Sequence, residues 1–452
     1  MSSRKRSKKL GAKKDPVAGL SVLNAHTAGI DVGSREHWVA VPADRDPTPV
    51  RSFGTFTADL HEMANWLKQC GVTSVAMEST GVYWIALFEI LEEAGFEVCV
   101  VNARDAKNVP GRKSDIQDAQ WLQKLHSYGL LSKSFRPVSE VRVLRSYMRQ
   151  RENLATGSHQ CVQHIQKALT EMNIRLVQVL SDIMGKSGRA IIDAIMAGER
   201  DPGVLATLVD RRVKASPSMI RKSLEGDWRE EQFFIIEQQL ALHTHYQALI
   251  SACDQRIERH LQQMVGLGGG SKPPAEDLYA SLQRLTGVDL TRIEGIEVKT
   301  AQIILSEVGV DMSRWPTEKH FSSWLGLCPN HQITGGRVLS RHTRKVVNRA
   351  STALRRAAST LRLNKSALGA KYRRLHARLG APKAITAIAH HLARLVYRMI
   401  RYGHEYVAHH AEHYEKKYRD QQIRWVRKRA AEFNLQVIDA GMVMLNPAVE
   451  VP

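Results

Sequence analysis

Four acidic residues near the N-terminal side of the chain have the types and spacing that metal-dependent phosphoryl transfer requires. Asp31 lies in the apolar run AGIDVG, Glu78 ends the apolar run VTSVAME, and Asp115 and Asp118 are spaced i, i+3 where a helical pattern begins. Two divalent ions about 4 Å apart must be held by several carboxylates that still leave room for a phosphate. A carboxylate in an apolar strand is costly unless it is paired or binds a metal. We therefore predict that these four acids are metal ligands and catalytic residues.

Each acid also has a purely structural explanation. Asp115 could simply favour the positive end of a helix dipole, and Glu78 could be a solvated strand end. An isolated aspartate in a strand, such as Asp31, is usually a turn or pairing residue. The order strand, strand, helix pair within one basic chain favours a shared site over separate explanations.

Alternating strand and helix patterns between residues 26 and 129 would position these acids. The expected strands are 26–34, 37–43, 49–56, 72–78 and 96–103. The expected helices are 59–71, 81–95 and 114–129, the last with Ser114 as its N-cap. If strands 26–34 and 72–78 are neighbours, Asp31 and Glu78 emerge at the same sheet edge. This order predicts an α/β fold with helices packed on a mixed sheet.

The charge of the chain predicts a polyanionic partner. There are 65 Lys and Arg residues against 45 Asp and Glu, which gives a net charge of +20. Neutralising phosphates releases counterions, and this release supplies most non-specific affinity for nucleic acids. A merely basic or ribosome-associated protein is the alternative. The basic N-terminus MSSRKRSKKLGAKK lacks the apolar core of a signal peptide, so residues 1–23 are expected to be a disordered tail that contacts phosphates.

Cysteine usage and hydropathy predict a cytoplasmic protein. The five cysteines are scattered and form no CxxC pair, which argues against a zinc site and a disulfide framework. No apolar run reaches the roughly 18 residues that a membrane span needs, so no membrane partner is expected. The pairs His390 with His391 and His409 with His413 lack a third ligand or an HExxH pattern, so we interpret them as ordinary helix residues.

The rest of the chain is predicted to be mostly helical. We expect a catalytic domain at 24–135, a helical region at 136–265, a linker at 266–277, a second domain at 278–402 and a helical extension at 403–452. In the helical region, apolar residues from Ile236 to Met264 recur at three- and four-residue steps, an imperfect coiled-coil pattern. This seam either packs within the chain or mediates self-association, and the sequence leaves both open.

The second domain contains a hairpin pattern and a strongly basic stretch. LTRIEGIEVKTAQIILSEVG predicts a helix-hairpin-helix around Gly295 and Ile296, which could offer backbone N–H groups to a phosphate. Glu294 and Glu297 would repel phosphate there, so a structural hairpin is an equal alternative. Between Gly335 and Arg401 there is no Asp or Glu, which favours a nucleic-acid surface. The candidate contacts are Arg337, Arg341, Arg344, Lys345, Arg349, Arg355, Arg356, Arg373 and Arg374.

Five motifs resemble one family of enzymes. AGIDVGS, VAMESTGVYW and GRKSDIQDAQWL are similar to the three blocks of the DEDD transposases of bacterial insertion sequences, described as bridge-RNA-guided recombinases. IEGIEVKTAQIILSEVG and WLGLCPNHQITGGRVLS resemble the second domain of that family. The resemblance implies a RuvC-like, ribonuclease-H-like N-terminal domain with its four acids at Asp31, Glu78, Asp115 and Asp118, and a mostly α C-terminal transposase domain.

The resemblance also implies a hydroxyl nucleophile in the second domain. The family has a serine beside a glycine that becomes covalently linked to DNA, whereas this chain reads ITGG and has Thr334 there. Threonine can perform the same chemistry with a stiffer side chain. Ser340 is the rival nucleophile, and Thr343 ranks behind both. A loop hydroxyl that only makes a local turn bond is the structural alternative.

Cofactor and partners follow from the same resemblance. It implies Mg²⁺, with Mn²⁺ as a substitute, donor and target DNA, a guide RNA encoded by the element, and a dimer or tetramer whose partner subunit completes each active site. A hydrolytic RuvC-like nuclease or resolvase, with water as nucleophile, is the first rival. A non-enzymatic nucleic-acid scaffold is the second, and the intact set of four acids argues against it.

Overall fold

The fold is described from a computed structural model. The structure describes residues 20–102, 114–264, 277–340, 342–344, 346–404, 420 and 423–437. The chain divides into two compact units, Met1–Arg136 and Pro137–Pro452, and each is described by itself. Most of the expected tail, linker and C-terminal extension lies outside the described residues.

Unit 1 is built on a five-stranded mixed sheet. The strand order is β3-β2-β1-β4-β5, in which β1 to β3 are antiparallel neighbours and β1, β4 and β5 are parallel. The strands are β1 (Thr27–Val32), β2 (Glu36–Ala40), β3 (Val50–Gly54), β4 (Ser74–Glu78) and β5 (Glu97–Val101). This order and these directions make the domain ribonuclease-H-like, as predicted.

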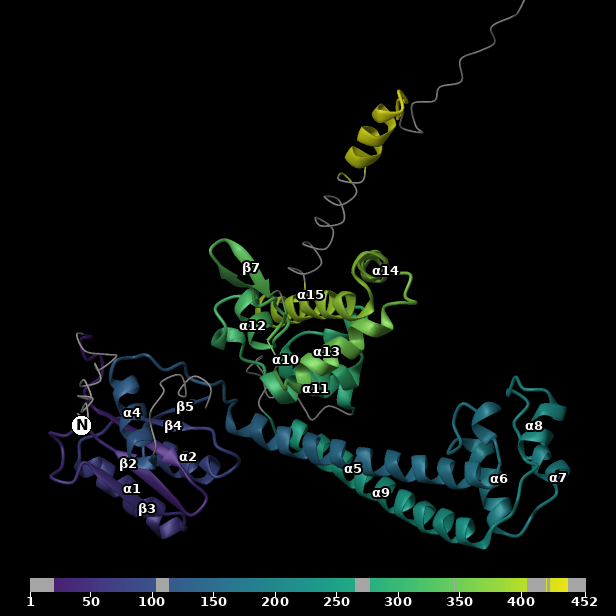
Figure 1. The fold of residues 1–452 in the computed structure, drawn as a ribbon, viewed down its shortest axis with the longest axis horizontal. Coiled ribbons are helices and arrows are strands. Elements are labelled where there is room, and N and C mark those ends of the chain that lie inside the picture. The colour runs from purple at the N-terminus through teal and green to yellow at the C-terminus, as the bar shows by residue number, and fades with distance from the viewer. Residues whose placement is uncertain are drawn as a thin grey trace, which may run out of the picture. The chain divides into compact units, whose positions relative to one another are not determined.

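Helices cover both faces of this sheet (Figure 1). On one face, α1 (Thr57–Gln69) and α2 (Trp84–Glu93) bury their apolar sides against Ile30 and Met77 in the main core. On the other face, α4 (Asp115–Ser127) packs Leu122 against Ala76, Cys99 and Val101 in a smaller cluster. Successive strand residues point to opposite faces, so each face receives every second residue of a strand.

Unit 2 begins with a long antiparallel helix pair, α5 (Ser139–Glu171) and α9 (Glu230–Gln263) (Figure 1). Contacts between the two helices include an ion pair of Arg151 with Asp254 and a hydrogen bond of 2.9 Å from Gln247 Nε2 to Ser158 Oγ. The α9 seam that was open to self-association is therefore used within the chain, where it packs against α5. Its buried residues include Ile236, Leu240, Ile257 and Leu261.

Short helices close the far end of this pair. They are the 3₁₀ turn η1 (Leu176–Gln178), α6 (Lys186–Met196), α7 (Pro202–Thr207) and α8 (Pro217–Ser223). Ile191, Ile192 and Ile195 of α6 share an apolar core with Leu169 of α5 and Ile236 of α9. At the other end, Arg145 of α5 donates to the carbonyl oxygen of Glu307 at 2.6 Å. The helix pair is thus anchored to the rest of unit 2.

The remainder of unit 2 is a helical body with one small β-hairpin. The central helix α15 contacts α12, α13 and α14, and Ile388, Leu392 and Val396 on it are fully buried. Tyr397 Oη donates to the carbonyl oxygen of Trp315 at 2.8 Å. The elements are α10 (Leu278–Thr286), η2 (Leu290–Arg292), α11 (Val298–Val308), η3 (Met312–Arg314), α12 (Glu318–Trp324), β6 (Gln332–Thr334), β7 (Arg337–Ser340), α13 (Arg349–Thr360), α14 (Ala367–Leu379) and α15 (Ala381–Tyr402).

The structure differs from the predicted helix-hairpin-helix. Before the turn stands only the single 3₁₀ turn η2, and α11 follows it. Gly295 has φ +84°, and a Cβ there would lie 3.0 Å from the carbonyl oxygen of Ala357 in α13. Glu294 accepts a hydrogen bond from the backbone N–H of Leu368 at 3.3 Å. The turn therefore packs against the body of unit 2, where Gly295 is half-buried and Ile296 is buried, and this packing supports the structural alternative.

Three further observations concern predictions made from composition. All five cysteines are free thiols. Among the described residues, no helix is long and apolar enough to cross a membrane. His409 and His413 lie outside the described residues, whereas His391 is on α15, where burial and then the neighbouring cation Lys371 lower its pKa to about 3.

Candidate active site

Asp31 and Glu78 stand beside one another at the carboxyl end of two neighbouring strands. The parallel pairing of β1 with β4 places Ala28 opposite Val75, Gly29 opposite Ala76 and Ile30 opposite Met77. Asp31 and Glu78 are the next residue on each strand. Adjacent strands are about 4.8 Å apart, so the two carboxylates leave the sheet from adjoining positions.

These two acids share the face of the sheet that α4 covers. Ile30 and Met77 belong to the core beneath α1 and α2. Because side chains alternate along a strand, Asp31 and Glu78 point to the opposite face. On that face Ser74 Oγ lies 2.7 Å from His126 Nε2, and Ala76 contacts Leu122. Both partners belong to α4.

Close contacts fix the direction of α4 against β1. Thr27 Oγ1 lies 2.8 Å from Ser127 Oγ near the end of the helix. Two residues further along the strand, a Cβ on Gly29 would lie 2.2 Å from the backbone nitrogen of Gln123 and 2.4 Å from the carbonyl oxygen of Ala119. Only glycine permits this approach. The helix therefore runs opposite to the strand, and its first turn lies toward Asp31.

That first turn carries the remaining two acids. Ser114 is the N-cap, and its side chain accepts from the backbone N–H of Gln117 at 3.4 Å. Asp115 and Asp118 follow, spaced so that they share one side of the helix. The positive end of the helix dipole favours negative charge here. Strand register and helix direction thus bring all four acids to one edge and one face of the sheet.

The acids differ in exposure and are not drawn to a single point. Asp31, Glu78 and Asp118 are half-buried, whereas Asp115 is exposed. Thr80 Oγ1 donates to Glu78 Oε1 at 3.4 Å. Within the described part of the chain, no three His, Cys, Asp or Glu side chains are grouped so as to hold a metal ion. Carboxylates repel one another, and drawing them around one point requires the charge of a cation.

The two leading hydroxyl candidates lie on the β6–β7 hairpin of unit 2. Thr334 pairs with Arg337 across a two-residue turn, Gly335 and Gly336, whose φ angles are +53° and +77°. Two positive φ angles identify a tight hairpin turn that glycine supplies without strain. Thr334 is exposed at the tip. Ser340 is half-buried at the base, and its Oγ accepts from the backbone N–H of His342 at 3.3 Å.

The third hydroxyl candidate, Thr343, lies beyond the hairpin. It forms an isolated backbone bridge with Pro329 and is half-buried. Its hydroxyl is therefore less accessible than that of Thr334.

The predicted basic contacts near the hairpin have varied surroundings. Arg337 is exposed beside the turn, and Arg341 and Lys345 lie outside the described residues. Arg344 donates to the carbonyl oxygen of Ser323 at 2.5 Å. Arg349 forms an ion pair of 2.7 Å with Glu152 of α5. Part of the donor capacity of Arg344 and Arg349 is thus used within the protein.

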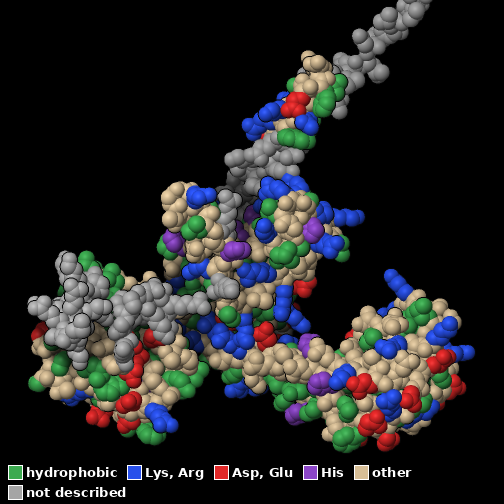
Figure 2. Space-filling model, in the orientation of Figure 1, with side chains coloured by type: hydrophobic (Ala, Val, Ile, Leu, Met, Phe, Trp, Pro, Cys, Tyr) green, Lys and Arg blue, Asp and Glu red, His purple; other side chains and the backbone are tan. Residues whose placement is uncertain are grey.

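On the following helices the division is similar. Arg355 donates to Ser351 Oγ at 3.0 Å, whereas Arg356 is exposed. Arg373 donates to the carbonyl oxygen of Asn364 at 2.6 Å, and Arg374 to that of Ala370 at 3.4 Å. Figure 2 shows Lys and Arg side chains over the body that holds α12 to α15.

Two exposed cations on this body were not singled out from the sequence. Arg362 and Lys365 lie on the loop between α13 and α14. Their signal is a short break between two helical patterns in which both charged residues are basic.

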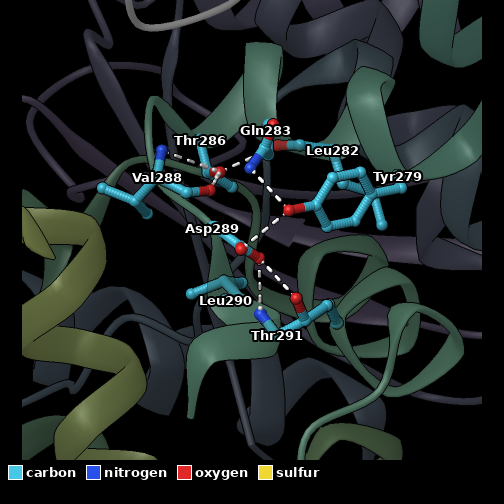
Figure 3. Close-up of a pocket in the computed structure, with 9 residues that line it drawn as sticks. Tyr279, Leu282, Gln283, Thr286, Val288, Asp289, Leu290 and Thr291 are labelled. Atoms are coloured by element: carbon cyan, nitrogen blue, oxygen red, sulfur yellow. Dashed lines mark hydrogen bonds between the residues drawn. The ribbon is translucent and has the colours of Figure 1, made fainter.

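A small cavity beside α10 is a structural feature rather than a substrate pocket. Its volume of about 10 Å³ has room for one water at most. Tyr279 Oη donates to Asp289 at 2.8 Å, Gln283 donates to Tyr279 Oη at 2.9 Å, and Thr291 donates to Asp289 at 2.6 Å (Figure 3). This network joins α10 to η2.

Comparison with known families agrees with these observations. Residues 28–174, which include the four acids, match a family model of DEDD transposases described as "Transposase". Residues 289–373, which include the hairpin and α13, match a model described as "Transposase IS116/IS110/IS902 family". No curated protein matches the chain. Transposases of this kind transfer phosphoryl groups in DNA, and DEDD transposases are typically metal-dependent. The chain belongs to the IS110 family of transposases, with a DEDD domain on its N-terminal side and the second transposase domain in its C-terminal half.

Proposed function

We propose that Asp31, Glu78, Asp115 and Asp118 form the metal-binding centre with which this transposase cuts DNA. The observation that carries the proposal is the shared edge, where Asp31 and Glu78 follow paired residues of β1 and β4. The start of α4 faces the same place. A set of carboxylates is what hard cations prefer, so the proposed ion is Mg²⁺, with Mn²⁺ able to replace it. When bound, such ions would neutralise charge on the phosphate and stabilise the transition state.

The protein supplies the positions of the ligands. Asp31 and Glu78 are held by two hydrogen-bonded strands, so their separation is set by the sheet. Asp115 and Asp118 are held by one capped helical turn that glycine at position 29 allows to lie against the strand. Thr80 donates to Glu78 and orients its carboxylate.

The proposed nucleophile is the hydroxyl of Thr334. It is exposed at the tip of a hairpin, whereas the Ser340 hydroxyl, the alternative, is half-buried and already accepts a backbone hydrogen bond. In the proposed step, the Thr334 oxygen bonds to phosphorus and gives up its proton. The bond from phosphorus to one deoxyribose oxygen breaks, and that oxygen leaves protonated. The resulting ester retains the energy needed for rejoining.

Variants of the acids test the metal centre. Asp31→Asn, Glu78→Gln, Asp115→Asn and Asp118→Asn should each abolish strand cleavage in Mg²⁺ and leave DNA binding nearly unchanged. Glu93→Gln is a matched control because Glu93 is an exposed acid on α2, on the other face of the sheet. Cleavage is measured on DNA that carries the ends of the element. Normal cleavage by a folded single variant would remove that residue from the centre.

A guide RNA and a homo-oligomer complete the proposal. The basic stretch from Gly335 to Arg401 offers cationic surface for more than one nucleic acid. The α9 seam packs against α5, but α9 also exposes Phe234, Leu242 and Leu249, which a second subunit could cover. The protein is purified from its host. Sequencing of the RNA bound to it tests the guide RNA, and light scattering of its complex with DNA tests the homo-oligomer. Chains that carry no specific RNA and stay monomeric on DNA would contradict them.

A further inference from the structure

The loop between α13 and α14 presents a leucine to solvent. Leu363 is 87% exposed, and its neighbours Arg362 and Lys365 are exposed as well. Exposing a leucine side chain forfeits the stabilisation that its burial would provide. A side chain that contributes nothing to the core of its own chain is suited to contact something else.

The loop is held in shape beneath this leucine. Arg373 Nη1 donates to the carbonyl oxygen of Asn364 at 2.6 Å and to that of Arg362 at 3.4 Å. Asn364 Oδ1 accepts from the backbone N–H of Ser366 at 2.8 Å. A Cβ on Gly369 would lie 2.1 Å from the carbonyl oxygen of Asn364, so α14 lies directly under the loop. The backbone on both sides of Leu363 is thus tied to α14.

The base of the loop rests on the core of unit 2. Leu361 is fully buried, and a Cβ on Gly295 would lie 3.2 Å from its side chain. Glu294 accepts from the backbone N–H of Leu368 in the first turn of α14. The turn at Gly295, for which the sequence left a phosphate contact and a structural role open, therefore supports this loop.

The charge around Leu363 indicates the partner. Arg362 and Lys365 flank it, and no acidic residue occurs anywhere between Gly335 and Arg401. An apolar protein partner would gain nothing from these cations, whereas a polyanion would. Many proteins that bend DNA from the minor groove insert apolar side chains between base steps, while cations bind the phosphates.

We propose that Leu363 is a wedge that enters the minor groove of duplex DNA and unstacks a base step. Arg362 and Lys365 hold the phosphates on either side, and Arg373 positions the loop. The inference rests on the DNA binding that follows from the family and does not depend on the acidic centre. Its failure therefore leaves the proposed metal site untouched.

Fluorescence of 2-aminopurine tests the wedge. The full-length chain is titrated into a DNA duplex of about 30 base pairs with 2-aminopurine beside a flexible TA step. Fluorescence should rise on binding because the base unstacks. Leu363→Ala should lose this rise. It should also weaken binding on the order of tenfold, because the variant forgoes the free energy gained when a leucine side chain is buried. Leu363→Met, which keeps a long apolar side chain, should retain most of both.

Controls separate the wedge from charge and from folding. Leu379→Ala removes another exposed leucine from the end of α14 and should change neither signal. Arg362→Ala or Lys365→Ala should lower the slope of log K against log salt by about 0.9 each, whereas Leu363→Ala should leave the slope unchanged. A folded Leu363→Ala variant with unchanged fluorescence rise and affinity would overturn the proposal. So would an equal effect on an RNA duplex of the same sequence, because its groove differs in shape.

Discussion

Gly29 and Gln123 approach so closely that a Cβ on Gly29 would lie 2.2 Å from the backbone nitrogen of Gln123. This contact sets the distance between β1 and α4. It therefore sets the distance between the acids that each element carries.

Gly29→Ala should move α4 away from the sheet and reduce DNA cleavage by more than tenfold, although all four acids remain. The added methyl group meets backbone atoms that cannot rotate away, so unfolding should also become easier by on the order of 2 kcal/mol. Cleavage rate and thermal unfolding are measured together.

Gly95→Ala is the control for this change. Gly95 has φ +91°, and a Cβ there would meet nothing within 4 Å, so alanine causes backbone strain without displacing a neighbour. It should lower stability and leave cleavage by the folded enzyme intact. If the two variants lose activity equally at equal stability, the distance between β1 and α4 does not matter.

Exposed and internally paired arginines should differ in DNA binding. Arg356→Ala removes an exposed cation, so it should weaken binding to all sequences and lower the salt slope by about 0.9. Arg349→Ala breaks the ion pair with Glu152 and should change the slope less. Filter binding over a range of salt concentrations measures both. Equal slopes for Arg356→Ala and the unaltered chain would exclude Arg356 from the phosphate contacts.

Glu318 should make unit 2 sensitive to acid. Burial opposes its ionisation, but hydrogen bonds from Arg398 at 2.8 Å and Arg394 at 3.1 Å lower the pKa of Glu318 to about 2. Because the folded pKa lies below the ordinary value of 4.5, the stabilisation is complete above pH 4.5 and disappears as the pH falls toward 2.

Glu318→Gln should therefore lower the unfolding free energy at pH 7 by on the order of 2 kcal/mol. The difference from the unaltered chain should shrink below pH 4.5. Glu297→Gln, at an exposed acid, is the control. A difference that stays constant with pH would mean that Glu318 acts through packing rather than charge.

The sequence predicted the parts of the fold that depend on local pattern. In unit 1, alternation of apolar residues located each strand, and Ser114 marked the start of α4 because a cap bonds within three residues. The sequence could not show that β1 and β4 are neighbours, because the partner of a strand depends on residues far along the chain. The shared position of Asp31 and Glu78 was therefore predicted only on the condition that these strands pair. The register that aligns Asp31 with Glu78 needed the structure.

Contacts between distant residues explain the remaining differences. An apolar seam on α9 does not encode whether its partner is α5 or another subunit. Arg373 has the composition of a phosphate contact, yet it donates to the carbonyl oxygen of Asn364. The residues next to Gly295 in the sequence also do not indicate that α13 packs against this glycine.

Trapping of covalent protein–DNA complexes tests the central claim most directly. The unaltered chain and Thr334→Ser should give a complex that survives denaturation and disappears with protease, because both keep a hydroxyl at the hairpin tip. Thr334→Ala should give none, Ser340→Ala should still give it, and Asp31→Asn or Glu78→Gln should abolish it without preventing DNA binding. A complex that persists in Thr334→Ala and vanishes in Ser340→Ala would transfer the role to Ser340. Cut DNA without any covalent complex would contradict the account and make water the nucleophile.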